Sequence, residues 1–213
     1  MKLISVNVGL PREVAWKDRV VTTGIFKKPI SGRAKVHRLN IEGDRQADLT
    51  VHGGEEKAVY VYPAEHYGFW RSELPEMQLN WGAFGENLTI EGLLEEQVNI
   101  GDRFRIGSAE FMVTQPRFPC YKLGVKFERD DMVKRFLVSR RTGFYLSVIS
   151  EGELGAGDQI ELLSRDASEI TVADIVRLHV DKEKDFDLMR RATEVEALAE
   201  GWRNHFLELL AKA

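Results

Sequence analysis

The chain has 213 residues, of which 43% are hydrophobic and 30% are charged. This length allows one large or two small domains with a real hydrophobic core, and the composition excludes a disordered or low-complexity protein. The 30 Lys and Arg residues against 34 Asp and Glu give a formal charge of −4. The chain therefore lacks the excess of positive charge that binding to DNA or to an anionic membrane would require. We therefore expect small molecules or proteins as partners, and neither nucleic acid nor membrane.

Charged residues interrupt every apolar run well before the ~20 residues that a membrane-spanning helix needs, so no span is expected. The N-terminal run contains Ser5 and Asn7, which is unlike the continuous apolar region of a signal peptide. The single cysteine, Cys120, cannot form a disulfide within the chain, as is usual in a reducing compartment. We therefore expect a cytoplasmic location.

Up to about Leu163 the chain alternates short β-rich runs with Gly, Pro and Asp, a pattern typical of a barrel or sandwich. Nine runs predict strands, namely 4–8, 19–26, 34–41, 58–62, 87–90, 103–106, 110–114, 144–149 and 159–163. Two short helices are predicted between them, one over 63–74 with Pro63 in its first turn and one over 130–138.

After Ser164 the hydrophobic period changes from two to 3.6 and glycines become rare, which predicts a first domain over 1–164 and a second over 165–213. Thr171 with Asp174 predicts a capped helix start, as does Thr193 with Glu196, and Asp185 or Asp187 could cap a helix between them. The last helix has an apolar stripe made of Val195, Leu198, Ala199, Trp202, Phe206, Leu209 and Leu210.

Three short helices raise the question of a DNA-binding helix-turn-helix. From Thr171 to Ala213 there are seven Lys or Arg and nine Asp or Glu, whereas a recognition helix needs cations that face phosphate. A packing or partner-docking role is favoured instead.

Cys120 lies in the segment Gln115-Pro-Arg-Phe-Pro-Cys-Tyr-Lys-Leu123, which the two prolines predict to be a stiff, non-helical loop. Arg117 and Lys122 would favour the thiolate, the form that acts as a nucleophile and as a soft-metal ligand. The alternative is a buried, inert cysteine, which is the common fate of a lone Cys.

A second candidate is the stretch from Asp44 to Ala58, which contains His52-Gly53-Gly54. Paired glycines let the backbone approach a ligand closely and can expose N–H groups to an anion such as phosphate; the alternative is an ordinary tight turn. The stretch lacks the spacing of ATP and NAD sites.

Other chemistries find little support. The five histidines show no zinc-site spacing, and the nucleophile elbow of Ser-His-Asp hydrolases is missing. Cys120 with His52 as a thiol nucleophile and its base stays a minor alternative.

The chain resembles the MOSC domain, the module named after the C-terminal part of molybdenum cofactor sulfurases. The matching stretches are 23–29, 43–48 continuing to 52–54 and 58–60, 84–88, 115–120 and 142–145, and together they extend over most of 1–164. The last three helices resemble the C-terminal domain of the bacterial YiiM-like branch, whose members are associated with detoxification of N-hydroxylated purine bases. The resemblance implies a mainly β fold with α-helices: a closed β barrel of complex topology, similar to that of pyruvate kinase, followed by a small three-helix domain.

The resemblance also implies a molybdenum cofactor of the molybdopterin type, with Cys120 as the catalytic residue and metal ligand. We expect the anionic cofactor to lie against His52, Gly53 and Gly54, with Asn87 and cations from among Lys28, Arg45, Arg117 and Arg141. Arg45 or Arg141 could instead be ion-pair partners of nearby carboxylates.

The implied function is an oxidoreductase that reduces N-hydroxylated small molecules such as N-hydroxylated purine bases. One cysteine cannot hold an iron–sulfur cluster, so an external electron-transfer reductase is expected as a partner. The alternative is a non-catalytic cofactor-binding or sulfur-carrier module that uses the same cysteine. A homodimer is compatible with both.

Overall fold

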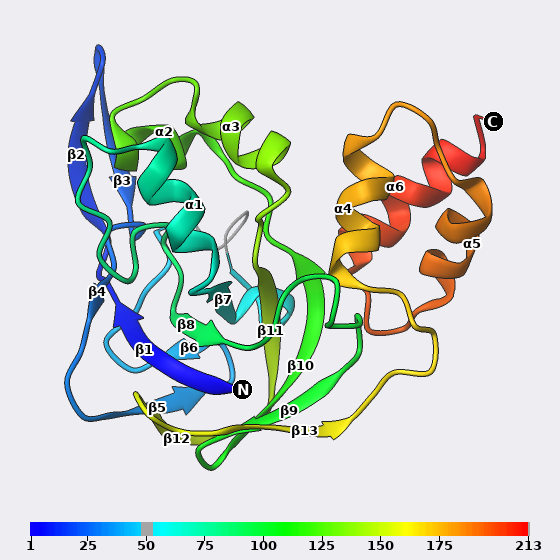
Figure 1. Ribbon diagram of the computed structural model, residues 1–213, viewed down its shortest axis with the longest axis horizontal. Helices are drawn as coiled ribbons and strands as arrows, with labels where there is room; N and C mark the ends of the chain where they lie inside the picture. Colours follow the sequence, from blue (N-terminus) through cyan, green and yellow to red (C-terminus); the bar gives the residue numbers. More distant parts are fainter. Residues whose placement is uncertain (48–52, 213) are drawn as a thin grey trace.

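The computed structural model describes residues 1–47 and 53–212. Its central feature is an eight-stranded sheet in the order β13-β9-β10-β11-β7-β8-β1-β4. These strands are β1 (Lys2–Val8), β4 (Lys28–Pro29), β7 (Val59–Pro63), β8 (Leu88–Glu91), β9 (Arg103–Ile106), β10 (Ala109–Pro116), β11 (Phe144–Ser150) and β13 (Ile160–Ser164). A second sheet contains β12 (Gly152–Gly155), β5 (Arg33–His37) and β6 (Asn40–Ile41), and β2 (Arg12–Trp16) with β3 (Arg19–Thr23) forms a projecting hairpin (Figure 1).

The large sheet bends back until β1 meets the segment before β13. The backbone N–H of Leu3 donates to the carbonyl of Asp158 at 2.9 Å, and the N–H of Gly157 donates to the carbonyl of Leu3 at 2.8 Å. The strand order still ends at β13 and β4, and the strand pairings in the described part of the chain do not form a ring. The fold is therefore mixed α/β with one large curved sheet, and these pairings do not establish the closed barrel that the resemblance predicts.

The connection between β7 and β8 differs from the prediction in one respect. The two strands pair in parallel, with Pro63 opposite Ile90, and helix α1 (His66–Glu73) lies between them in the chain. Pro63 thus ends a strand and does not begin the helix, and because the pairing of β7 with β11 stops at Val61, no strand pairing on that side needs an N–H at Pro63. The second predicted helix is present as α3 (Met132–Ser139).

The segment around Cys120 also differs from the predicted loop. Strand β10 extends through Gln115 and Pro116, which pair with Tyr145 and Phe144 of β11. Residues 117–120 form the loop, and helix α2 (Tyr121–Phe127) begins directly after Cys120. The helix forms because no proline follows Pro119, so the buried Leu123 and Phe127 can lie one turn apart on its core side.

The C-terminal residues form three helices, α4 (Val172–Val180), α5 (Phe186–Glu194) and α6 (Glu200–Leu210). The predicted capping box is confirmed, since the backbone N–H of Asp174 donates to the Thr171 hydroxyl at 3.0 Å. Asp185 is the cap of α5 and accepts from the N–H of Leu188 at 2.9 Å. The predicted cap at Thr193 is wrong: Thr193 lies in the last turn of α5 and its hydroxyl donates to the carbonyl of Arg190.

These helices share a hydrophobic core with the large sheet. One buried cluster contains sheet residues such as Phe104 and Val113 together with Ile175 and Leu178 of α4 and Phe206 of α6. Figure 1 shows α4 to α6 beside β10, and the N–H of Ala199 donates to the carbonyl of Thr114 in that strand at 3.2 Å. The helices are therefore anchored to the sheet by backbone and side chains alike.

A second buried cluster is largely aromatic and lies under α1 and α3, with Tyr62, Trp70, Phe84 and Phe136 among its members. Among the helices of the described residues, none has the length and apolarity needed to cross a membrane.

Candidate functional site

A pocket that is partly open to solvent lies at the end of the sheet, where β7, β10 and β11 meet the loops around Gly24, Arg45, Gly85 and Cys120. Its walls come from segments far apart in the sequence: Thr23, Gly24, Ile25, Lys27, Arg45, Gln46, Ala47, Lys57, Tyr60, Gly85, Asn87, Arg117, Phe118, Cys120, Lys122 and Tyr145. Among the described residues, the lining holds five cations and a thiol and no carboxylate. A pocket of this kind favours an anionic ligand.

Cys120 is half-buried at the wall of this pocket, so the alternative of a fully buried, inert cysteine does not hold. It is the residue before α2, and its carbonyl accepts from the backbone N–H of Leu123 at 2.9 Å. Cys120 is therefore fixed by the start of a helix as well as by the proline that precedes it.

Arg117 is the most constrained cation of the pocket. It is 6% exposed and its guanidinium lies 5.2 Å from the ring centre of Tyr60 and 5.0 Å from that of Phe136. Its Nη1 atom is buried without a hydrogen-bond partner among the described residues. Burying a charged donor without a partner is costly, so this atom marks a place where an anion or hydrogen-bond acceptor would stabilise the protein.

The loop that contains Arg117 is tied to a buried acid. The backbone N–H of Arg117 donates to the carbonyl of Gly143 at 3.1 Å. The N–H of Gly143 in turn donates to Glu95 at 2.7 Å, and the same carboxylate contacts Nε2 of His66 at 2.8 Å. This chain of contacts fixes the backbone directly before Cys120, because each of its polar groups is paired.

Tyr60 and Tyr145 stand side by side in the pocket. They are paired in register on β7 and β11, and their ring centres are 5.3 Å apart. Burial raises the pKa of Tyr60 well above its usual value, and it also raises the pKa of Tyr145 despite the nearby Arg117. Both phenols therefore stay protonated at neutral pH.

Lys27 forms a buried ion pair with Asp44 at the back of the pocket. Asp44 also accepts from the amide of Asn87 at 2.9 Å and from the N–H of Gly9 at 2.9 Å. Burial lowers the pKa of Lys27, although Asp44 acts in the opposite direction. Asn87 thus serves first as a partner of Asp44, with the N–H of Tyr60 donating to its side-chain oxygen at 3.1 Å.

Two glycines allow the pocket loops to approach each other. A Cβ atom on Gly24 would lie 2.4 Å from the carbonyl oxygen of Arg45, and one on Gly85 would lie 2.7 Å from Cγ1 of Ile25. Gly85 also has a φ of +81°, which side-chain-bearing residues rarely adopt. Both positions require glycine for the walls to keep their spacing.

The structure brings some of the predicted site residues together. Cys120, Arg117, Arg45 and Asn87 all line the pocket. His52 lies outside the described residues, so the proposed Cys120 and His52 pair also lies outside them.

Other predicted residues lie elsewhere in the described part of the chain. Lys28 is exposed on a different groove, and Gly54 is exposed before the short helical turn η1 (Glu55–Lys57); neither they nor Gly53 line the pocket. Arg141 lies 4.0 Å from the ring centre of Phe69 and donates to the carbonyl of Ser139, so it is not a pocket residue and caps the end of α3. No ion pair with a described carboxylate is formed by Arg45 or Arg141.

Sequence reasoning missed Lys27, Lys57 and the two tyrosines as pocket residues. Side chains alternate along an extended segment, so of the neighbours Lys27 and Lys28 only one can face inward. Lys27 could have been identified only through its ion-pair partner Asp44. Asp44 lies 17 residues away in the sequence, and only the fold brings the two side chains together.

Comparison with known protein families assigns this fold and its pocket to a class. The family model "MOSC domain" matches residues 48–161 and the model "YiiM-like, 3-alpha helix domain" matches residues 170–213. The chain belongs to the MOSC family and has the C-terminal helical domain of its YiiM-like members.

Individual relatives agree with this assignment. The chain is 43% identical over 206 residues to the uncharacterized protein YflK of Bacillus subtilis, an alignment that covers 97% of this chain and 93% of that one. The crystal structure of YiiM from Geobacillus stearothermophilus superposes with a TM-score of 0.83 at 32% identity and covers 98% of both chains. A protein of Gibberella moniliformis named "Reductase" is 33% identical over 196 residues, which are 91% of this chain but only 35% of that protein.

Proposed function

We propose that this protein binds a molybdenum cofactor of the molybdopterin type in the Cys120 pocket and reduces N-hydroxylated small molecules there. The observation that carries the proposal is the pairing of a half-buried thiol with a buried arginine whose Nη1 has no partner among the described residues. MOSC membership and the name of the fungal relative are consistent with a redox role.

The residues present fit such a cofactor. A thiolate is a good ligand for a thiophilic metal, and Cys120 supplies it at the pocket wall. The cofactor's phosphate would be bound by Arg117, which can offer a planar fork of donors, with Arg45, Lys57 and Lys122 as further cations. In this proposal Lys28, Gly53, Gly54 and Arg141 are no longer cofactor contacts.

When bound, the cofactor would supply two electrons, so that R–NHOH with two electrons and two protons gives R–NH2 and water. The protein's own part is to bind, orient and supply protons. Tyr145 is a protonated phenol at the pocket wall and is our candidate for placing a proton on the leaving oxygen. Tyr60 donates its own hydroxyl to the carbonyl of Thr142 at 2.8 Å, so it acts as a rigid wall.

The electrons would come from an external reductase. We propose a cytoplasmic site of action on the ground that the one cysteine is engaged in the pocket rather than in a disulfide. We further propose that residues 1–164, folded as the barrel-like unit, contain the site, whereas 165–213 hold its loop in place.

The second candidate is a cofactor-binding or sulfur-carrier module without turnover. The partial exposure of Cys120 favours the carrier, because a carried group must be accessible to the partner that receives it. Steady-state reduction of an N-hydroxylated purine base by cofactor-loaded protein, with a supplied artificial reductant, distinguishes the two. Repeated turnover supports the enzyme, and cofactor retention without turnover supports the carrier.

A further inference from the structure

A second groove contains four cations that form no ion pair with a carboxylate of the described residues. It is lined by Arg12 of the β2–β3 hairpin, Lys28, Arg71 of α1 and Lys126 of α2, and Lys27 is shared with the Cys120 pocket. None of the described residues that line it is Asp or Glu. The groove thus collects positive charge from four separate elements.

Several arginines elsewhere in the described chain have a carboxylate partner. Arg33, Arg38, Arg105 and Arg129 each form an ion pair with a carboxylate at 3.1 Å or less. The four groove cations form no ion pair with a described carboxylate, and three of them, Arg12, Arg71 and Lys126, contact aromatic rings. Arg12 lies 3.8 Å and Lys126 4.8 Å from the ring centre of Phe26, and Arg71 lies 5.6 Å from that of Trp81.

Lys126 is the groove cation that an anionic ligand would stabilise most. It is half-buried, and burial lowers its pKa to about 8, with Arg12 and Lys28 acting in the same direction and the buried Glu86 against them. A half-buried ammonium among like charges is destabilising, and an anion in the groove would offset the cost of burial and the repulsion by supplying a counter-charge.

The groove also offers apolar surface, from Met77, Trp81 and Phe127 among others. We propose that this groove is a second binding site, distinct from the Cys120 pocket, for a small organic phosphate whose anionic group lies among Arg12, Lys28, Arg71 and Lys126. The apolar portion of such a ligand would pack on the groove's aromatic wall. The concave shape and the partial burial of Lys126 favour a small molecule over the convex surface of a protein.

Calorimetry on the purified full chain at low ionic strength tests the proposal, because salt screens exposed cations. The probes are adenosine 5′-monophosphate, inorganic phosphate and adenosine. We expect the monophosphate to bind more tightly than phosphate, and adenosine to bind at least about tenfold more weakly than the monophosphate, since charge-assisted hydrogen bonds supply most of the affinity. Equal binding of adenosine, or no binding of the monophosphate, overturns the proposal.

Variants then locate the site. Lys126→Met keeps the apolar stem and should weaken monophosphate binding by about tenfold, as should Arg12→Gln on the exposed hairpin. Lys134→Met on α3 removes an exposed cation outside the groove and should change nothing. Unchanged affinity in both groove variants contradicts the site.

Two further measurements separate this site from the cofactor pocket. Cys120→Ser should bind the monophosphate normally, and cofactor-loaded and cofactor-free protein should bind it alike; loss of binding in either comparison would place the ligand in the Cys120 pocket and overturn the proposal. Affinity should fall above pH 8 as Lys126 loses its proton, and the fall should be absent in Lys126→Met. The other charged groups near Lys126 are Glu86, Arg12, Lys28, Lys27 and Arg71, and a fall that persists in Lys126→Met would assign the titration to one of them.

Discussion

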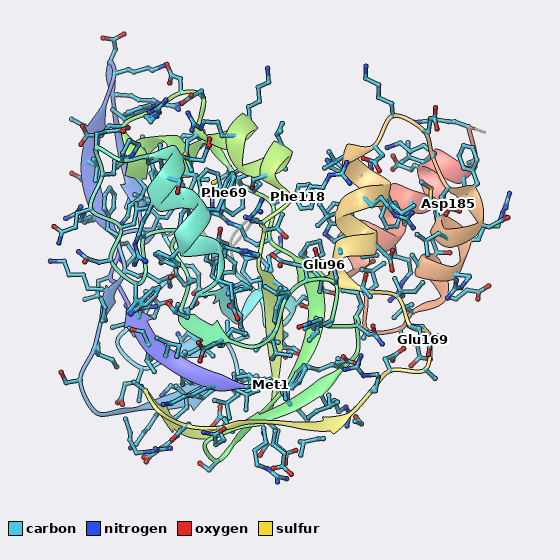
Figure 2. The ribbon with its side chains drawn as sticks, viewed as in Figure 1. Met1, Phe69, Glu96, Phe118, Glu169 and Asp185 are labelled. Carbon is cyan, nitrogen blue, oxygen red and sulfur yellow. The ribbon has the colours of Figure 1, made fainter. Side chains whose placement is uncertain are left out.

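Phe118, two residues before Cys120, packs edge-on against His179 of α4 with the ring centres 4.6 Å apart. Figure 2 labels Phe118 on the side of its loop that faces the C-terminal helices. Trp202 of α6 completes the contact at 4.7 Å from Phe118. The C-terminal helices therefore touch the loop that carries the proposed metal ligand. Because Phe118 also lines the pocket, movement of these helices would be transmitted to the site.

The first prediction concerns this contact. Phe118→Ala should lower the free energy of unfolding by roughly 1 to 3 kcal/mol, because it removes two aromatic contacts of a half-buried ring. It should also lower cofactor retention, since the Cys120 loop loses its support. Chemical denaturation and metal analysis measure the two effects. Val138→Ala, at an exposed apolar position on α3, is the control and should leave both unchanged; the same retention in Phe118→Ala would show that the helices do not support the loop.

The second prediction concerns the C-terminal helices as a unit. Deleting residues 170–213 should destabilise the rest of the chain, because it exposes core residues such as Val113 that pack in the cluster shared with Ile175 and Phe206. It also removes the contact between the N–H of Glu200 and Glu56 of η1, beside Lys57. Thermal unfolding of the truncated chain checks this. A melting temperature equal to that of the full chain would mean that 165–213 is an independent appendage.

The third prediction uses Arg117. Arg117→Met should abolish cofactor retention while leaving the stability of the cofactor-free protein unchanged or raised by about 1 kcal/mol, because an apolar side chain relieves the buried, partly unpaired charge. Arg117→Lys should also lose retention, since an ammonium lacks the planar fork of donors. Loss of cofactor without loss of stability is the diagnostic combination. A purely structural arginine would instead lose stability on replacement by methionine.

The fourth prediction concerns the buried pair Lys27 and Asp44. Asp44→Asn should destabilise the protein by about 3 kcal/mol, because it leaves the Lys27 ammonium buried without its counter-charge. The double variant with Lys27→Met should recover most of that loss, since neither charge is then left alone. A denaturation series of the two single variants and the double variant gives the coupling. Additive losses would show that the two groups do not depend on each other.

Much of the fold could be predicted from local pattern. The run 103–106 is β9 as predicted, and alternation placed β11 and β13 within a residue or two. The predicted run 34–41 is in fact β5 and β6 joined by a turn at Arg38 and Leu39, a distinction that alternation alone does not make. Strands β2, β4 and β12 were missed because they are short or largely exposed, so burial leaves little periodic signal in them.

The site was predictable only in part, for a physical reason. Cys120 and Arg117 are close in sequence and share a stiff loop, so local chemistry identified both. Long-range packing decides which distant residues lie beside Cys120 and Arg117. Arg45 reaches the pocket because Gly24 lets its segment approach. Arg141 does not reach it, because contact with Phe69 holds it at the end of α3. The prediction of a separate C-terminal domain likewise came from the hydrophobic period and the composition. Neither property shows that the last three helices share their core with the sheet.

The central claim is that Cys120 binds the metal of a molybdenum cofactor, and the molybdenum content per chain tests it most directly. The wild-type chain and Cys120→Ser should be purified in parallel from a host that makes the cofactor, with circular dichroism to show that both are folded. Because serine changes little volume but is a poorer ligand for a soft site, we expect near-stoichiometric molybdenum in the wild type and little in the variant. Equal molybdenum in the two proteins, or none in the wild type, would contradict the account.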